Sequence, residues 1–153
     1  MAYWLFKSEP DDYSIEDLQT ETAGFAVWDG IRNYQARNFL RDDVAVGDGV
    51  LFYHSSCKNV GVVGTARVVR DAYPDPAQFD PESRYFDPKA SHEVPRWFCV
   101  DVTFDAAFDR LVALSELREI PELADMVLLN RGRLSVQPVT DSEWDLITSL
   151  GQA

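Results

Sequence analysis

The segment from Trp28 to Asn38, Trp-Asp-Gly-Ile-Arg-Asn-Tyr-Gln-Ala-Arg-Asn, carries side chains that a turn and a short helix do not need in order to fold. Trp28 offers a flat aromatic face for stacking, and the amide of Asn33 can donate to and accept from the edge of a heterocycle. Arg32 and Arg37 can each present a planar guanidinium to a phosphate. The combination indicates a pocket that stacks a flat ring, hydrogen-bonds its edge and holds a neighbouring phosphate.

Each of these residues also has a purely structural explanation. A tryptophan belongs to a hydrophobic core more often than to a binding cage. Asn33 precedes a helical pattern and can cap it, and it serves both purposes only if the cap uses the carbonyl oxygen and the ligand uses the amide group. Arg32 and Arg37 can form surface ion pairs with the abundant carboxylates. The sequence alone leaves these alternatives open.

Polar residues near strand ends extend the candidate site to other parts of the chain. Lys7 follows an apolar run, at a position where pockets of barrel-like sheets open, although it can instead pair with Glu9 at the rim. Ser135 and Gln137 are in phase on an otherwise apolar segment. That phase indicates either a hydrogen-bonded network in the core or the wall of a cavity.

The sequence contains little that supports catalysis or metal binding. His54 and Ser55 are adjacent, and adjacent residues of an extended segment point to opposite sides, so the imidazole is poorly placed to activate the hydroxyl. No Gly-x-Ser-x-Gly motif surrounds a serine. The two cysteines, Cys57 and Cys99, form no Cys-x-x-Cys pair, and only two histidines are present. We therefore expect no catalytic residue, no cofactor and no metal ion.

Composition and charge narrow the class of protein further. The chain has 153 residues, of which 46% are hydrophobic, and this predicts one globular domain over residues 1–153. A net charge of −12 argues against a protein that coats nucleic acid through many Lys and Arg contacts, but it permits a small basic mouth on an acidic body. The apolar run at the start is too short for a signal peptide or a spanning helix, and cysteines are sparse, so we expect a cytoplasmic protein without membrane contact.

Alternation and turn signals predict about six strands and four or five short helices. The strands are expected at residues 3–7, 25–28, 50–54, 60–69, 96–104 and 134–139. Helices are expected at 14–18 and 33–41, from Ser115 and from Pro121, and from a capping box at Thr140 to Gly151. Residues 71–95, rich in proline, form a long ordered loop. Because strands do not alternate with long helices, the pattern favours an α+β fold: a mostly antiparallel, barrel-like sheet with short helices at its ends.

Several of these segments together resemble one family. The segments at 3–10, 28–38, 50–55, 72–76, 85–88, 95–97 and 134–138 occur in the order typical of the EVE domain family, and the resemblance covers about residues 2–148. It implies a PUA-like pseudo-barrel, a group that includes domains recognising methylated adenine in RNA. It also implies a non-catalytic module that binds nucleic acid, DNA or RNA, and recognises a modified base, a modified cytosine, in an aromatic-lined pocket.

The resemblance implies a role for each candidate binding residue. Trp28 would stack on the base, and Asn33, Ser55 and Ser135 would contact its polar edge. Lys7, Arg32 and Arg96 would meet phosphate or other anionic groups, and Tyr53, Tyr85 and Trp97 would supply the remaining walls. Two other functions stay open: a pocket for a small anionic metabolite, or an enzyme acting on one, and an interaction module whose acidic C-terminal helix docks a protein partner.

Overall fold

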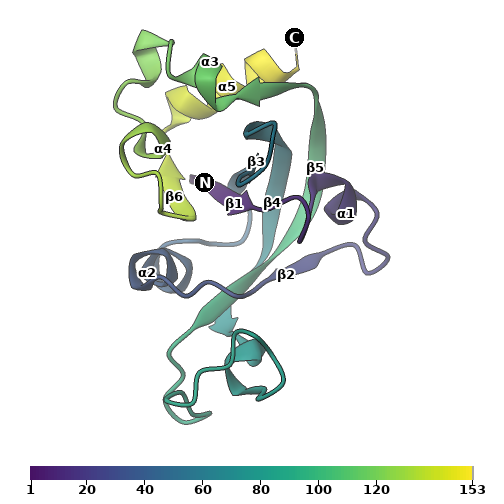
Figure 1. The fold of residues 1–153 in the computed structure, drawn as a ribbon, viewed down its shortest axis with the longest axis vertical. Coiled ribbons are helices and arrows are strands. Elements are labelled where there is room, and N and C mark those ends of the chain that lie inside the picture. Colours follow the sequence, from purple (N-terminus) through teal and green to yellow (C-terminus); the bar gives the residue numbers. More distant parts are fainter. Residues whose placement is uncertain (153) are drawn as a thin grey trace.

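The computed structural model describes residues 1–152 and is built around one six-stranded sheet (Figure 1). The strands are β1 (Tyr3–Ser8), β2 (Ala26–Trp28), β3 (Gly49–His54), β4 (Gly61–Pro74), β5 (Phe98–Ala113) and β6 (Val136–Val139). Their order across the sheet is β2-β5-β4-β3-β1-β6. β1 and β3 run parallel, and the other neighbouring pairs are antiparallel, which confirms the predicted mostly antiparallel α+β fold.

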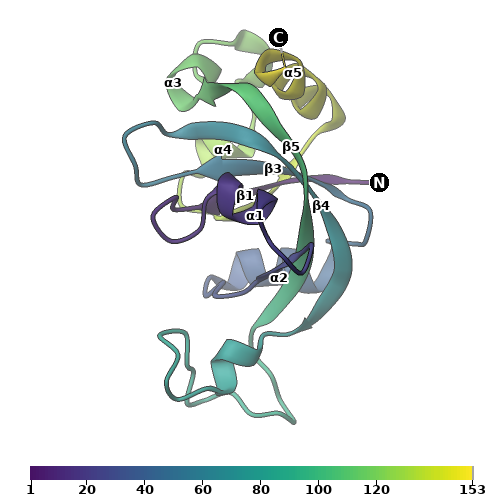
Figure 2. The ribbon, with the colours of Figure 1, turned by 90° about the vertical axis from the view of Figure 1, so that its right-hand side faces the viewer.

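The long β4–β5 hairpin bends the sheet. The register of this pair shifts at four points between Val62 and Tyr73, and a further shift separates β3 from β4 at Phe52 and Tyr53. Each shift is a bulge or irregularity that kinks the strand and increases its twist. Figure 2 shows the resulting curvature of β4 and β5 from the side. Both strands are longer than predicted, because the chain continues to pair beyond the bulges at which simple alternation ends.

Local capping signals set the ends of the helices. The helices are α1 (Ile15–Gln19), α2 (Tyr34–Asp42), α3 (Leu114–Leu117), α4 (Val127–Asn130) and α5 (Asp141–Gly151), with short 3₁₀ turns η1 (Pro76–Phe79) and η2 (Pro121–Leu123). Ser14 and Thr140 form capping boxes, and Asn33 caps α2. These ends confirm the predicted helix starts, whereas α4 was not predicted and Pro121 starts a 3₁₀ turn instead of an α-helix.

Two predicted strands begin later than expected. Arg96 and Trp97 precede β5, because the Gln78 side-chain carbonyl accepts hydrogen bonds from both of their backbone N–H groups, at 2.9 and 3.0 Å. Ser135 lies in a bend before β6, where its carbonyl oxygen accepts from the Lys7 N–H at 2.9 Å. The Gln78 side chain thus replaces strand pairing at Arg96 and Trp97, whereas the hydrogen bond between Lys7 and Ser135 continues the β1–β6 pairing beyond the regular strand.

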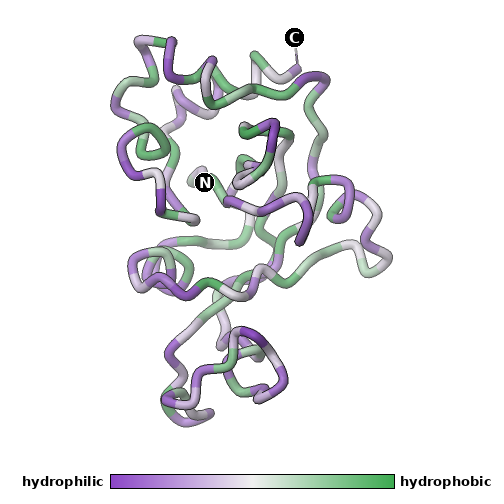
Figure 3. Tube along the Cα trace, viewed as in Figure 1, coloured by the Kyte–Doolittle hydropathy of each residue, from purple (hydrophilic) through white to green (hydrophobic). Residues whose placement is uncertain are grey.

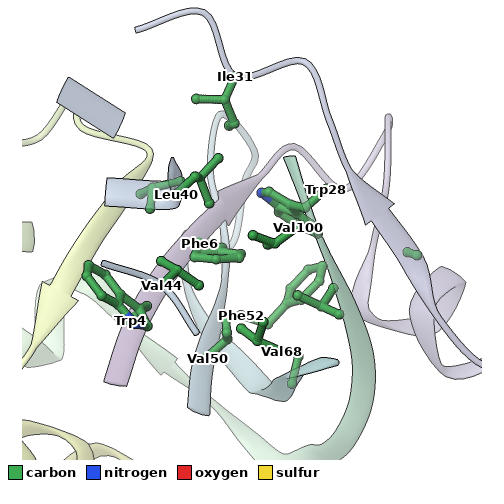
Figure 4. Close-up of a cluster of buried hydrophobic side chains, with 14 of the residues drawn as sticks. Trp4, Phe6, Trp28, Ile31, Leu40, Val44, Val50, Phe52, Val68 and Val100 are labelled. Atoms are coloured by element: carbon green, nitrogen blue, oxygen red, sulfur yellow. The ribbon is translucent and has the colours of Figure 1, made fainter. Parts of the chain in front are cut away.

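Side chains from the two faces of the sheet pack into two separate hydrophobic clusters. Trp4 and Phe6 of β1 enter the first cluster together with Trp28 (Figure 4), whereas Leu5 between them enters the second. The second cluster lies under α3 and α5, through Leu117 and Ile147. β3 is buried at all six positions, as its uniformly apolar sequence predicts. Figure 3 shows hydrophilic residues recurring along the outer helices and loops.

Within residues 1–152, no helix is both long enough and apolar enough to cross a membrane.

Candidate functional site

A cavity of about 650 Å³ opens beside β2, on the side of the sheet that holds the first hydrophobic cluster. Four separate parts of the chain form its walls: the end of β1 with the loop that follows, the loop before β2 and β2 itself with its following turn, the loop of residues 80–97, and the bend before β6. The lining residues are Lys7, Ser8, Glu9, Asp12, Tyr13, Glu21, Ala23, residues 25–31, Arg84, Tyr85 and Ser135.

Trp28 forms a rigid wall of this cavity. Its ring packs against Phe6, at a centroid distance of 5.5 Å, and meets Phe52 edge-on at 5.4 Å. Tyr13 meets it edge-on from the cavity side at 6.3 Å. Only 7% of Trp28 is exposed, and its ring lies among the buried side chains of the core (Figure 4), so the core fixes its orientation. One margin of the side chain still borders the cavity.

The indole N–H of Trp28 is unused. The N–H of Trp4 donates to Asp48 at 2.9 Å, and that of Trp97 donates to Asp87 at 2.7 Å. In contrast, the N–H of Trp28 donates to no acceptor within residues 1–152, and it is not among the fully buried atoms without a partner. An indole N–H seeks an acceptor when it is buried, so this donor is available to a ligand in the cavity.

Carboxylates outnumber cations around the cavity. Glu9, Asp12, Glu21 and Asp29 line it, against Lys7 and Arg84. Arg84 lies 3.4 Å from the Asp12 carboxylate and is partly neutralised by it. The interior therefore favours ligand groups that donate hydrogen bonds and disfavours anions.

Two of the acidic groups differ in their surroundings. Burial raises the pKa of the Asp29 carboxyl, and the neighbouring Asp75 carboxylate raises it further. Glu21 accepts a hydrogen bond of 2.5 Å from the Tyr13 hydroxyl. Burial and this hydrogen bond raise the pKa of Tyr13, so its proton stays in place. Asp29 is thus the carboxyl next to Trp28 whose side chain is committed to no other side chain of the described chain.

Lys7 joins the cavity to the segment before β6. Its Nζ donates to the Gly132 carbonyl oxygen at 2.5 Å, and burial lowers its pKa. Its backbone N–H donates to the carbonyl of Ser135 at 2.9 Å. The expected alternative, an ion pair with Glu9, does not form among residues 1–152.

The Arg32–Asp75 ion pair holds two of the cavity walls together. The guanidinium lies 3.0 Å from the fully buried Asp75 carboxylate and donates twice to the Tyr85 carbonyl oxygen, at 2.8 and 3.1 Å. Asp75 also accepts from the backbone N–H of Gly30 at 2.9 Å and of Ala77 at 2.8 Å. The turn after β2 and the loop of residues 80–97 are therefore joined through one carboxylate.

Tyr85 packs closely on the turn after β2. Gly30 has a φ of +77°, a conformation that favours glycine. A Cβ at this position would lie 2.7 Å from two atoms of the Tyr85 ring. The close approach of ring and backbone seals this side of the cavity.

Four of the ten predicted binding residues lie together in the cavity lining: Lys7, Trp28, Tyr85 and Ser135. Three others form a cluster outside that lining. Trp97 stacks on Tyr34 at 4.8 Å, Arg96 donates to the Tyr34 hydroxyl at 2.7 Å, and Arg32 lies 5.3 Å from the Trp97 ring. These three side chains hold the loop of residues 80–97 and are occupied with protein contacts.

The remaining three predicted residues are separate from the cavity. Asn33 lines a smaller groove, and its side-chain oxygen accepts a hydrogen bond from the backbone N–H of Ala36 at 2.9 Å. Its side-chain N–H₂ group remains available as a donor. Tyr53 is buried in the second hydrophobic cluster, and burial raises its pKa to about 12. Ser55 lines neither hollow, and its backbone N–H donates to the Ser8 carbonyl at 3.0 Å.

Several lining residues were not predicted from the sequence, notably Tyr13, Glu21, Asp29 and Arg84. Asp29 directly follows Trp28, which is a signal for the site, but Asp29-Gly30 is also the pattern of a turn. The others sit in loops without periodicity, and the bend of the sheet decides which loops meet.

The described chain offers no cluster of side chains that could hold a metal ion, and the imidazole of His54 already takes part in a hydrogen bond. His54 Nε2 accepts from the Ile15 N–H at 3.2 Å, and burial lowers the pKa of the imidazole. Over the described part of the chain, no three His, Cys, Asp or Glu side chains gather in a way that could hold a metal ion.

Comparisons with known proteins show which proteins this chain is similar to. The family model described as EVE domain matches residues 2–150. Thymocyte nuclear protein 1 of Mus musculus is 43% identical over 165 residues, covering 97% of this chain and 73% of that protein. The crystal structure of the human THYN1 protein in complex with 5-methylcytosine-containing DNA superposes with a TM-score of 0.95 at 39% identity, covering 100% of this chain and 99% of that one. A hypothetical protein from Leishmania major gives a TM-score of 0.93 at 49% identity, covering 99% and 94%.

Removing the charge of Asp75 should loosen the cavity walls. Asp75→Asn breaks a partly buried ion pair and turns an amide towards N–H donors, so we expect a loss of about 2–4 kcal/mol in the free energy of unfolding. Urea denaturation measures this loss. Asp109→Asn, at an exposed position of β5, is the matched control and should change stability by less than about 0.5 kcal/mol. Equal losses in the two variants would contradict the role of Asp75.

Gly30→Ala and Gly24→Ala separate backbone strain from the Tyr85 contact. Both glycines have positive φ, at +77° and +81°, so both variants lose about 1–2 kcal/mol to strain. A Cβ meets nothing within 4 Å at Gly24 but meets the Tyr85 ring at Gly30. Gly30→Ala should therefore lose a further 1–3 kcal/mol, roughly the cost of overpacking, in urea denaturation. Similar stabilities would mean that Tyr85 does not seal this wall.

Proposed function

Because the chain belongs to the EVE domain family, we propose that it binds nucleic acid and recognises a modified cytosine in the cavity beside Trp28. The observation that carries the proposal is a cavity of about 650 Å³ bordered by a rigid indole ring whose N–H is unused. A relative solved with 5-methylcytosine-containing DNA covers the whole of this chain, which supports the same class of ligand here.

The energetics favour a base that has left its stack. Unstacking costs a few kcal/mol in a duplex and least in a single strand. Contact with an aromatic side chain returns about 1–3 kcal/mol per base. A buried methyl group adds only about 0.8 kcal/mol, so the methyl group alone gives modest discrimination. Selectivity must therefore come mainly from hydrogen bonds at the edge of the base.

The carboxylates of the lining can accept hydrogen bonds from the edge of a cytosine base. A carboxylate accepts a hydrogen bond from the exocyclic amino group of cytosine. Thymine carries the same methyl group as 5-methylcytosine, but it presents an oxygen acceptor where cytosine presents this amino group. We assign the amino-group contact to Asp29, the carboxylate adjacent to Trp28. Of the ten residues singled out in the sequence, we assign ligand contact to the four in the lining.

The alternative ligand, a small anionic metabolite, fits this cavity less well. Four lining carboxylates would repel it, and the ammonium group of Lys7 already donates to the Gly132 carbonyl. An enzymatic role has little support from His54, because its Nε2 accepts a backbone hydrogen bond. The proposed activity is therefore binding without a catalytic step, in the cytoplasm as the sequence predicts.

The base preference can be measured with three single-stranded DNA oligonucleotides that differ only in a central 5-methylcytosine, cytosine or thymine. In fluorescence anisotropy titrations, the affinity for the 5-methylcytosine oligonucleotide should be roughly fourfold higher than that for the cytosine oligonucleotide, because the methyl group is buried. The affinity for the 5-methylcytosine oligonucleotide should be at least about tenfold higher than that for the thymine oligonucleotide, because the thymine oxygen leaves a carboxylate without a hydrogen-bond donor. Asp29→Asn should remove most of the preference over thymine, and Asp109→Asn should leave it unchanged. Equal affinities of the wild-type protein for the three oligonucleotides would contradict the proposal.

Trp28→Phe tests the aromatic wall without emptying the core. Trp28→Ala would leave a void beside Phe6 and Phe52 and destabilise the fold, so that a loss of binding could result from unfolding alone. Phenylalanine keeps most of the packing but removes the indole N–H and shortens the ring. The affinity for 5-methylcytosine DNA should fall about fivefold or more, by the loss of roughly 1 kcal/mol of aromatic contact and hydrogen bonding. The control is Trp144→Phe, because Trp144 stacks on Tyr3 away from the cavity. Equal effects of the two substitutions would count against contact between Trp28 and the base.

A further inference from the structure

A second hollow lies between the start of α2 and the loop of residues 130–134. It has a volume of about 260 Å³, and Asn33, Gln35, Arg131 and Arg133 are among its lining residues. We call it the arginine groove. None of its lining residues is Asp or Glu. On a chain with a net charge of −12, a hollow with two arginines and no carboxylate stands apart from the acidic cavity.

Hydrogen-bond donors in the arginine groove are only partly used. Arg131 donates to the Gln35 side-chain oxygen at 2.6 Å, which links the loop to α2. Arg133 is exposed and takes part in no ion pair with any carboxylate of residues 1–152. The Asn33 side-chain oxygen is taken up by the helix cap, so its amide N–H₂ group is the part left to meet a ligand. These groups are donors, as a phosphate requires.

The arginine groove and the cavity share a thin wall. Gly132 and Leu134 line the groove, and the next residue, Ser135, lines the cavity. Consecutive Cα atoms are only about 3.8 Å apart. Lys7, on the cavity side, reaches the Gly132 carbonyl oxygen at 2.5 Å. Figure 1 shows the corresponding segment between α4 and β6 facing α2.

We propose that the arginine groove holds a backbone phosphate next to the base in the cavity; this inference rests on the proposed function. The carboxylates of the cavity repel a phosphate, so the backbone must remain outside when the base enters. The nearest hollow free of carboxylates is the one across the wall of residues 132–135. A guanidinium presents two parallel N–H groups to a phosphate, and the charge of a local patch attracts the anion even on an acidic body.

The test is the salt dependence of binding to single-stranded DNA. The wild-type protein, an Arg131→Gln/Arg133→Gln double variant and an Arg118→Gln control are titrated with oligonucleotides carrying 5-methylcytosine, cytosine or an abasic site at the centre. Arg118 is exposed at the end of α3 and lines neither hollow. Each lost phosphate contact should lower the slope of log affinity against log salt by about 0.7. Because the groove holds one phosphate, we expect the double variant to lose about 0.7 in slope and roughly tenfold in affinity for all three oligonucleotides, with the control unchanged.

The outcomes separate this inference from the proposed function. A shallower slope with an unchanged preference for 5-methylcytosine supports both. A shallower slope in a protein that shows no base preference supports the arginine groove and overturns base recognition. An unchanged slope in the double variant, or a loss of base preference without a change in slope, overturns the arginine groove. A wild-type protein that binds none of the oligonucleotides overturns both, because no phosphate contact then exists.

Discussion

One buried carboxylate, that of Asp75, holds the candidate site in shape. It lies at the end of β4 and accepts hydrogen bonds from the turn after β2, from Arg32 and from the start of η1. Arg32 extends this connection to the Tyr85 carbonyl. Segments more than forty residues apart in the chain thus meet at a single charge. A cavity made of loops keeps a defined volume only when such contacts fix the loops to the sheet.

The charge distribution explains how a strongly acidic chain suits a polyanionic ligand. Carboxylates gather where we place a base, whose edge donates hydrogen bonds, and arginines without carboxylate neighbours gather where we place a phosphate. The net charge of −12 opposes non-specific attraction at long range. Binding then depends on short-range fit at two neighbouring positions and not on the overall field.

Local signals predicted much of the fold and part of the site. Ser14, Asn33 and Thr140 set helix starts through contacts three residues away, so a short window of sequence contains the information. The bulges of β4 and β5 depend on pairing between distant strands, and no such window contains them. For the same reason Arg32, singled out as a phosphate contact, lies instead against Asp75: a sequence does not distinguish an arginine that meets a phosphate from one that meets a buried carboxylate. Tyr13 and Glu21 were missed because the curvature of the sheet brings their loops to Trp28.

The thin wall formed by residues 132–135 has a consequence for the size of ligand that the molecule retains. Two weak attachment points on either side of one short segment act together on any ligand that spans them, because the first contact raises the effective concentration of the second. A free nucleoside or a free phosphate engages one point only and dissociates quickly. A polymer that reaches both sites therefore binds more tightly than a monomer that reaches one of them, whichever base it carries.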